Sequence, residues 1–258
     1  MKKIALLLSA LLALSVMFYG CGKKNEASPA SSDASASESA QSMPSTESEI
    51  VGHNLKINAD DITLLQAQAP SADSQVATIK TSAGDIKIVL YPSEAPKAVE
   101  NWIALAKKGY YDNQKFYEVL PSVRISTGDP EGTGNKGESS FEGGEKFDDE
   151  YSINLWHFNG AVAMNNGGSA GRNDSRFYMI QNSSISDDLA EEMLDAGFPE
   201  KVVDQYLKVG GVPNYDFKDT VFAQVIEGLD IVEKIASTPR DDANKPKEDI
   251  TILSIEIA

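Results

Sequence analysis

Two charged residues stand inside an apolar stretch of the chain, KFYEVLPSVRISTGDP over 115–130. Glu118 and Arg124 have apolar neighbours, Pro121 interrupts the stretch, and a Gly-Asp-Pro turn ends it. The pattern predicts two short strands joined by a proline turn. A charge is costly to bury unless it is paired. A carboxylate and a guanidinium at this spacing therefore indicate an ion pair or a pocket that handles charge.

Three other motifs are compatible with chemistry, and each has a simpler structural explanation. GTGNKG at 132–137 matches GxGxxG, but SSFEGGEKFDDE follows without helical periodicity, which favours a flexible loop over a dinucleotide site. A Ser-His-Asp triad needs His53 or His157; the first precedes the folded region, and the second lies in an apolar run that favours a structural role. DDE at 148–150 suggests a metal or glycosidase site, and a solvated acidic turn explains it more simply.

The first 21 residues have the layout of an export signal. Two lysines precede an apolar stretch over 4–19, and Gly20 and Cys21 follow. Cys21 is the only Cys of the chain and stands where a bacterial lipoprotein signal places its lipidated Cys. We expect lipidation at Cys21, which would anchor the protein to the plasma membrane on its extracytoplasmic side. A free Cys and an uncleaved anchor are the alternatives. A lone Cys also excludes an internal disulfide and a CxxC site.

Composition divides the rest of the chain. Ser, Ala and Glu dominate residues 22–75, which predicts a disordered tether, although the more apolar part over 50–69 could pack on the folded domain. The formal net charge of −16 favours solubility and argues against nucleic acid as a partner. The hydrophobic content of 41% is sufficient for a core, and no apolar run after residue 20 is long enough to predict a membrane span.

A folded domain is predicted over residues 76–258. VATIK and IKIVLY around a Gly turn predict a hairpin, and 95–109 predicts a helix with Trp102 in the core. Two short helices are expected within the segment 183–211, the second opened by Pro199. Further strands are expected at 116–120, 123–127, 160–164, 176–180 and 220–226, then a helix at about 228–236 and a final strand, ITILSIEI. Many short strands with two helices favour a closed barrel over a layered α/β sheet.

Four segments in order resemble a cyclophilin-type peptidyl-prolyl cis-trans isomerase. They are ATIKTSAGDIKIVLYPSEAPKAVENWIALAKKGYYDNQKFY, GDPEGTGNKGESSFEGGEKFDDE, GAVAMNN…SRFYMI and DTVFAQVIEGLDIVEKIA. The resemblance runs from Val76 to Ala258, with the segment 183–211 as an addition. It implies a mainly β fold, a cyclophilin-like closed eight-stranded antiparallel barrel capped by two helices, here with a small helical insert.

The resemblance also implies where the substrate groove lies. The catalytic Arg of the family falls on Glu118 and the His before it on Tyr117. The Phe and Met that wall the proline pocket fall on Val123 and Arg124, and the Gln that holds the Arg falls on Ser126. Further positions of the groove fall on Asn165, Asn166, Arg176, Phe177, Tyr178, Asn214, Tyr215 and Asp219, where only Asn166 and Phe177 keep the family's residue.

The implied reaction needs no cofactor. Rotation of an X-Pro bond has a barrier of about 18–20 kcal/mol, and an Arg aimed at the prolyl nitrogen favours the twisted amide. Glu118 cannot donate a hydrogen bond when ionised, and its charge opposes what an Arg supplies. The sequence therefore predicts an isomerase for exported polypeptides with weak or lost catalysis. The alternative is a non-catalytic module that binds a partner at the cell surface. In either case we expect a monomer.

The charged groups at these positions suggest two hypotheses. Glu118, Asp219, Arg124 and Arg176 could pair with one another and form a mixed-charge floor that binds a polar ligand or nothing. Alternatively, one of the two arginines could reach the position of the family's Arg and restore weak catalysis.

Overall fold

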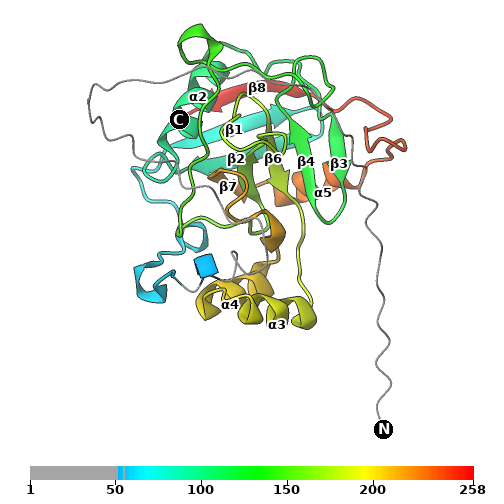
Figure 1. The fold of residues 1–258 in the computed structure, drawn as a ribbon. Helices are drawn as coiled ribbons and strands as arrows, with labels where there is room; N and C mark the ends of the chain where they lie inside the picture. The colour runs from blue at the N-terminus through cyan, green and yellow to red at the C-terminus, as the bar shows by residue number, and fades with distance from the viewer. Residues whose placement is uncertain (1–51, 55) are drawn as a thin grey trace, which may run out of the picture. The chain divides into compact units, whose positions relative to one another are not determined.

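The computed structural model describes residues 52–54 and 56–258. Within them, eight strands form one sheet whose neighbouring strands are all antiparallel, in the order β3-β4-β6-β5-β7-β2-β1-β8 (Figure 1). The strands are β1 (Val76–Thr81), β2 (Gly84–Leu90), β3 (Glu118–Leu120), β4 (Arg124–Thr127), β5 (Ala161–Met164), β6 (Phe177–Ile180), β7 (Val221–Glu227) and β8 (Ile252–Ile257). The predicted mainly β fold with eight antiparallel strands is confirmed. The predicted export signal, including Cys21, lies outside the described residues.

The curled sheet closes through the segment before β3 rather than through β3 itself. Lys115 forms an isolated antiparallel bridge with Thr251, next to β8. The N–H of Phe116 donates to the carbonyl of Ile250 at 2.9 Å, and the N–H of Ile252 donates to the carbonyl of Gln114 at 2.8 Å. Residues 115 and 116 therefore bond to the β8 side of the sheet, and β3 begins later than the predicted start at 116.

Two helices pack against the core of the sheet. Helix α2 (Pro96–Lys107) buries Val99 and Trp102, and α5 (Leu229–Ala236) buries Val232 and Ile235. The start of α2 has no side-chain cap of its own, and Glu150 supplies one from a distant loop. Its two carboxylate oxygens accept the N–H groups of residues 97 and 98, each at 3.0 Å. Both predicted helices and the core position of Trp102 are confirmed.

The helical insert forms a second apolar core beside the sheet. Helices α3 (Asp187–Asp195) and α4 (Glu200–Val209) lie side by side in Figure 1 and pack around buried Trp156, Met193 and Tyr206. Gly210 ends α4 with φ of 80°, and a Cβ there would lie 2.1 Å from the carbonyl oxygen of Asn182. Only Gly fits this exit. The two helices predicted within 183–211 are confirmed.

The segment before the sheet packs on this second core. Residues 59–61 and 65–67 form single 3-10 turns, and Ile62 is buried among the insert residues. Gln66 donates to the carbonyl of Trp156 at 2.9 Å and accepts its N–H at 2.7 Å. The predicted disordered tether over 22–75 is therefore too long at its C-terminal end, because apolar and amide side chains in this segment find partners on the domain.

Candidate functional site

Strand alternation gathers polar side chains on the outer face of β3, β4 and β6. Successive residues of a strand point to opposite sides of a sheet. Val119, Ile125 and Phe177 lie in the barrel core, so their neighbours face outward. The residues of this face, which we call the groove face, are Glu118, Arg124, Ser126 and Tyr178.

One carboxylate oxygen of Glu118 accepts hydrogen bonds from two other side chains of the groove face. Oε2 lies 3.1 Å from Nε and 3.1 Å from Nη2 of Arg124, and Oγ of Ser126 donates to the same oxygen at 2.9 Å. The side chains of Arg124 and Glu118 are 18% and 25% exposed, so water screens this pair only in part. Burial alone would lower the pKa of Arg124, but the charge and hydrogen bond of Glu118, together with the two tyrosines Tyr215 and Tyr178, outweigh it and the pKa is raised. Arg124 therefore stays cationic beside its carboxylate.

The guanidinium of Arg124 also covers two aromatic rings. Its Cζ lies 4.9 Å from the ring centroid of Tyr178 and 5.5 Å from that of Tyr215. Both distances allow a cation–π interaction. The two rings meet edge-on, with centroids 5.8 Å apart. Arg124 is thus held on one side by Glu118 and on the other by the two tyrosines.

A hydrogen-bonded chain runs from helix α4 to the groove face. Tyr206 of α4 donates to Asp216 at 2.7 Å, and Asp216 lies 3.0 Å from Nδ1 of His157. Nε2 of His157 lies 3.1 Å from the hydroxyl of Tyr178, which donates to Asp219 at 2.8 Å. Sequence reasoning gave His157 only a structural role and did not single out Tyr206. No local sequence motif predicts this series of hydrogen bonds, because its five residues come from four separate segments.

The hydroxyl of Tyr178 lies between His157 and Asp219. It donates to Asp219 at 2.8 Å and lies 3.1 Å from Nε2 of His157. Its single proton can serve only one acceptor at a time. Burial raises the pKa of Asp219 and so favours its protonated form.

Arg176 lies in a second cluster. Its Nε and Nη2 donate to Asp174, the latter at 2.7 Å, and Nη1 donates to the carbonyl of Gly134 at 2.8 Å. Lys146 also pairs with Asp174, whose side chain is fully buried. Glu118 instead pairs with Arg124. The hypothesis of one four-charge floor is therefore wrong in its pairing, because each arginine has a carboxylate of its own.

The remaining predicted groove residues differ in their surroundings. Tyr117 is buried, and its hydroxyl accepts from Asn165 at 3.2 Å. Asn166 is buried and donates to Asp149 and to the carbonyl of Lys218. Val123 is half-buried at the β3–β4 turn, and Asn214 is exposed.

Phe177 does not belong to the groove. Its side chain is fully buried, and its ring lies 6.0 Å from Trp102 and 5.5 Å from Tyr111, centroid to centroid. The alternation of β6 explains the difference, since Tyr178 faces outward and Phe177 must then face inward. Its assignment to the substrate groove is therefore wrong.

The glycine-rich loop over 132–137 is closed around a carboxylate of its own chain. Asp129 accepts N–H groups from Glu131, Thr133, Asn135 and Lys136 at 2.8–3.3 Å. Burial opposes the charge of Asp129, but these bonds outweigh it and lower its pKa. The loop amides that would cradle a phosphate are occupied, which supports the structural interpretation of the GxGxxG match.

The acidic run over 148–150 is not a simple solvated turn. Glu150 caps α2, and Asp149 accepts from Asn166, Asn173 and the N–H of Gly171. The simpler explanation offered from the sequence holds only for Asp148, which is largely exposed beside Lys97. In the described part of the chain, no group of three or more potential ligands is arranged to hold a metal ion.

This fold and site can be compared with known proteins. The family model described as cyclophilin type peptidyl-prolyl cis-trans isomerase/CLD matches residues 76–257. The chain therefore belongs to the cyclophilin-type peptidyl-prolyl cis-trans isomerase family. It is 39% identical over 204 residues to a Staphylococcus saprophyticus protein named "Putative peptidyl-prolyl cis-trans isomerase", which covers 79% of this chain and 95% of that protein.

Solved structures agree with this membership. A crystal structure of a Cryptosporidium parvum cyclophilin type peptidyl-prolyl cis-trans isomerase is 28% identical and superposes with a TM-score of 0.59, covering 72% of this chain and 98% of that one. A second crystal structure of the same protein, in the presence of the dipeptide Ala-Pro, gives a TM-score of 0.58 at 28% identity and covers 71% and 98%.

Proposed function

We propose that this chain acts on X-Pro segments of exported polypeptides, and that isomerase turnover in its groove is weak or lost. The observation that carries the proposal is the position of Arg124. It fills the space over Tyr178 and Tyr215, two positions that belong to the family's groove, while Glu118 stands at the position of the family's catalytic Arg. A proline ring can use this surface only after Arg124 moves away.

The energy of that movement can be bounded. A cation–π contact contributes about 0.5–2 kcal/mol, and a partly exposed ion pair about 0.2–1 kcal/mol. Displacing Arg124 from both therefore costs about 1–3 kcal/mol. This corresponds to roughly 5- to 100-fold weaker binding of a prolyl peptide. Glu118 adds a second penalty in the transition state, because an ionised carboxylate has no proton to donate to the prolyl nitrogen.

The location is part of the proposal. The export signal over 1–21 and the position of Cys21 support an extracytoplasmic protein that a lipid holds on the plasma membrane. Among residues 52–54 and 56–258, no helix has the length and apolar character needed to span a bilayer. Metabolic labelling with a radioactive fatty acid should label the chain and should not label Cys21→Ser. Equal labelling of both chains would contradict the anchor.

One observation favours a second candidate, an isomerase that uses Arg124 as its donor. In the family the Arg is held by a Gln at the position of Ser126. Here Ser126 holds Glu118, and Glu118 holds Arg124. An arginine is thus still oriented at this place, although it comes from β4 instead of β3. In this candidate, removing Arg124 abolishes turnover, whereas our proposal expects improved peptide binding.

The experiment is NMR exchange spectroscopy of an Ala-Pro peptide with the full chain and with Arg124→Ala. We expect little exchange above the uncatalysed rate in the parent, and roughly 5- to 100-fold tighter peptide binding in the variant. Arg172→Ala, at an exposed arginine, is the matched control and should behave as the parent. Strong exchange in the parent that disappears in Arg124→Ala would overturn the proposal and establish the second candidate.

A further inference from the structure

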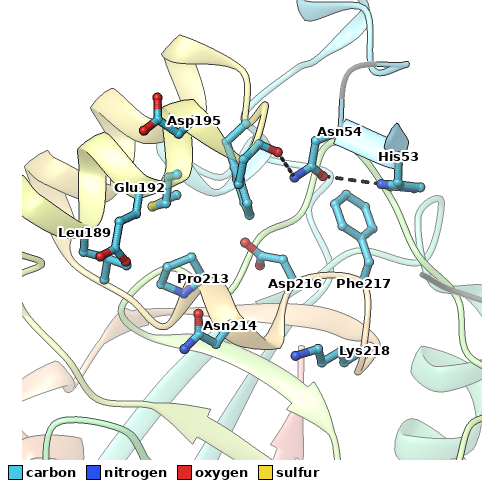
Figure 2. A pocket seen from close by; sticks show the side chains of 13 residues that line it. His53, Asn54, Leu189, Glu192, Asp195, Pro213, Asn214, Asp216, Phe217 and Lys218 are labelled. Atoms are coloured by element: carbon cyan, nitrogen blue, oxygen red, sulfur yellow. Dashed lines mark hydrogen bonds between the residues drawn. The ribbon is translucent and has the colours of Figure 1, made fainter. Parts of the chain in front are cut away.

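A cavity of about 630 Å³ lies between the helical insert and the loop that follows it. Figure 2 shows Glu192 and Asp195 of α3 on one side and Asp216 and Phe217 of the loop on the other. The volume falls within the range of about 300–1,000 Å³ that ligand-binding clefts have. None of the groove assignments explains this cavity, since only its Asn214 belongs to the family's groove.

Apolar side chains line much of the cavity. They are Leu189, Met193, Ala196, Phe198, Pro213 and Phe217. Phe217 has φ of 56°, a conformation that a bulky residue rarely adopts. Its ring is held 5.1 Å from Trp156 and 4.6 Å from His53, centroid to centroid. The fold therefore accepts backbone strain where it positions an aromatic ring at the cavity wall.

The rim of the cavity is acidic, and its exposed carboxylates on α3 form no ion pair in the described part of the chain. Helix α3 carries five acidic residues and no basic one. Its cavity-lining carboxylates, Glu192 and Asp195, are exposed, and neither makes an ion pair with a residue of 52–54 or 56–258. Lys218 contributes one positive charge to the lining. The chemistry of the lining thus suits an apolar group that carries a cation.

The cavity adjoins the groove through one short turn. Residues Pro213–Tyr215 form a single 3-10 turn, in which Asn214 lines the cavity while Tyr215 contacts Tyr178 and lies under Arg124. Neighbouring residues of one turn therefore line the groove and the cavity. Asp216 also lines the cavity, and it links Tyr206 to His157 in the series of hydrogen bonds that leads to Tyr178.

We propose that this cavity is a second binding site for the client polypeptide, which takes an apolar side chain followed or preceded by a basic one. The proposal rests on the proposed function in one respect, namely that the client is a polypeptide. It does not need a functional proline pocket, because the cavity and the groove face are formed by different residues.

The test uses the full chain and two labelled peptides. One carries a Leu-Lys pair in a Gly-Ser background without proline, and the other carries Ala-Pro in the same background. The variant Glu192→Gln/Asp195→Asn keeps the size of both side chains and removes their charges. We expect it to weaken binding of the Leu-Lys peptide about 3- to 10-fold, since each exposed pair is modest in energy, and to leave Ala-Pro binding unchanged. Glu191→Gln, an exposed acid of the same helix outside the cavity lining, is the matched control.

A second variant and a change in the peptide test whether the peptide contacts the cavity lining directly. Ala196→Leu introduces a larger side chain into the lining and should reduce binding of the Leu-Lys peptide more than 3-fold without loss of the folded signal in circular dichroism. Replacing Lys by norleucine in the peptide should weaken its binding to the parent by the same factor as the double variant weakens binding of the Lys peptide. Binding of the norleucine peptide to the double variant should be little weaker than with either change alone.

Several outcomes would overturn the proposal. One is binding of the Leu-Lys peptide that is insensitive to both cavity variants. Another is binding that appears only after residues 22–51 are deleted, which would mean that this chain's own segment occupies the cavity. Self-association that requires the cavity would identify a second copy as the occupant. By contrast, a parent chain that binds the Leu-Lys peptide but not the Ala-Pro peptide would support the cavity proposal and contradict only the proposed function of the groove.

Discussion

At the scale of single residues, the ion pairs that the charged side chains form determine what the groove face can bind. Glu118 and Arg124 were both expected in the groove, and the β3–β4 register brings them together. The sequence does not predict that Asp174 is the partner of Arg176. Asp174 lies in the loop before β6, so the conformation of that loop, and not strand register, brings the two side chains together. A sequence gives the charges of such a site, whereas register and loop geometry determine their pairing.

Asp219 gives a prediction about pH. Burial raises the pKa of its carboxyl in the folded chain, so the folded state holds this proton more tightly than the unfolded state does. The resulting stabilisation is complete below the unfolded pKa of about 3.9 and is lost as the pH rises through the folded value. Asp219→Asn cannot ionise. Its gain in unfolding free energy over the parent should therefore be larger near pH 7 than near pH 4.

The measurement is urea denaturation of parent and variant at a series of pH values. Each pH unit between the folded and unfolded pKa adds about 1.4 kcal/mol to the difference. Asp242→Asn, in an exposed loop, is the control for a general charge effect. A difference between Asp219→Asn and its parent that does not change with pH would show that the carboxyl is not neutral in the folded chain.

At the scale of elements, hydrophobic patterning predicted the strands and helices well. Predicted strands at 160–164 and 220–226 correspond to β5 and β7, and the helix at about 228–236 corresponds to α5. These apolar patterns predict the elements correctly because each strand or helix buries at least one of its faces. The sequence leaves the packing of residues 50–69 open. Ile62 in the insert core and the amide contacts of Gln66 hold the described part of this segment, and they form no repeating apolar pattern.

Gln66 tests how firmly that segment belongs to the domain. Its amide bonds to both main-chain groups of Trp156 and also donates to Oε1 of Gln224 at 2.8 Å. Gln66→Ala leaves the N–H of buried Trp156 without its partner, since only the carbonyl keeps one in the N–H of Phe158. The change should lower the free energy of unfolding by about 1–3 kcal/mol. Chemical denaturation followed by Trp fluorescence measures the loss. Gln68→Ala, at an exposed position of the same segment, should change it by less than about 0.5 kcal/mol.

At the scale of the whole molecule, the sheet depends on its last strand. Ile252 at the start of β8 is fully buried, and the next residue, Leu253, is 52% exposed. Ile252→Ala should cost about 2–5 kcal/mol of unfolding free energy, because it leaves a cavity in the core. Leu253→Ala should cost about 0.5 kcal/mol or less. Thermal unfolding of both variants distinguishes them, and equal losses would mean that β8 is not held in the described register.

The pairing of β1 with β8 joins residues 77–81 to residues 252–257. A chain that emerges from the ribosome or a translocation pore with its N-terminus first therefore presents β1 before its second neighbour exists. Until residues 250–257 appear, one edge of β1 is open to other strands, and residues 114–116 lack their partners at 250–252. Pairing across almost the whole domain also has a high entropic cost, which slows folding. Maturation of this domain should thus wait until residues 250–257 are free to pair, and during that interval its open strand edge can be bound by folding helpers.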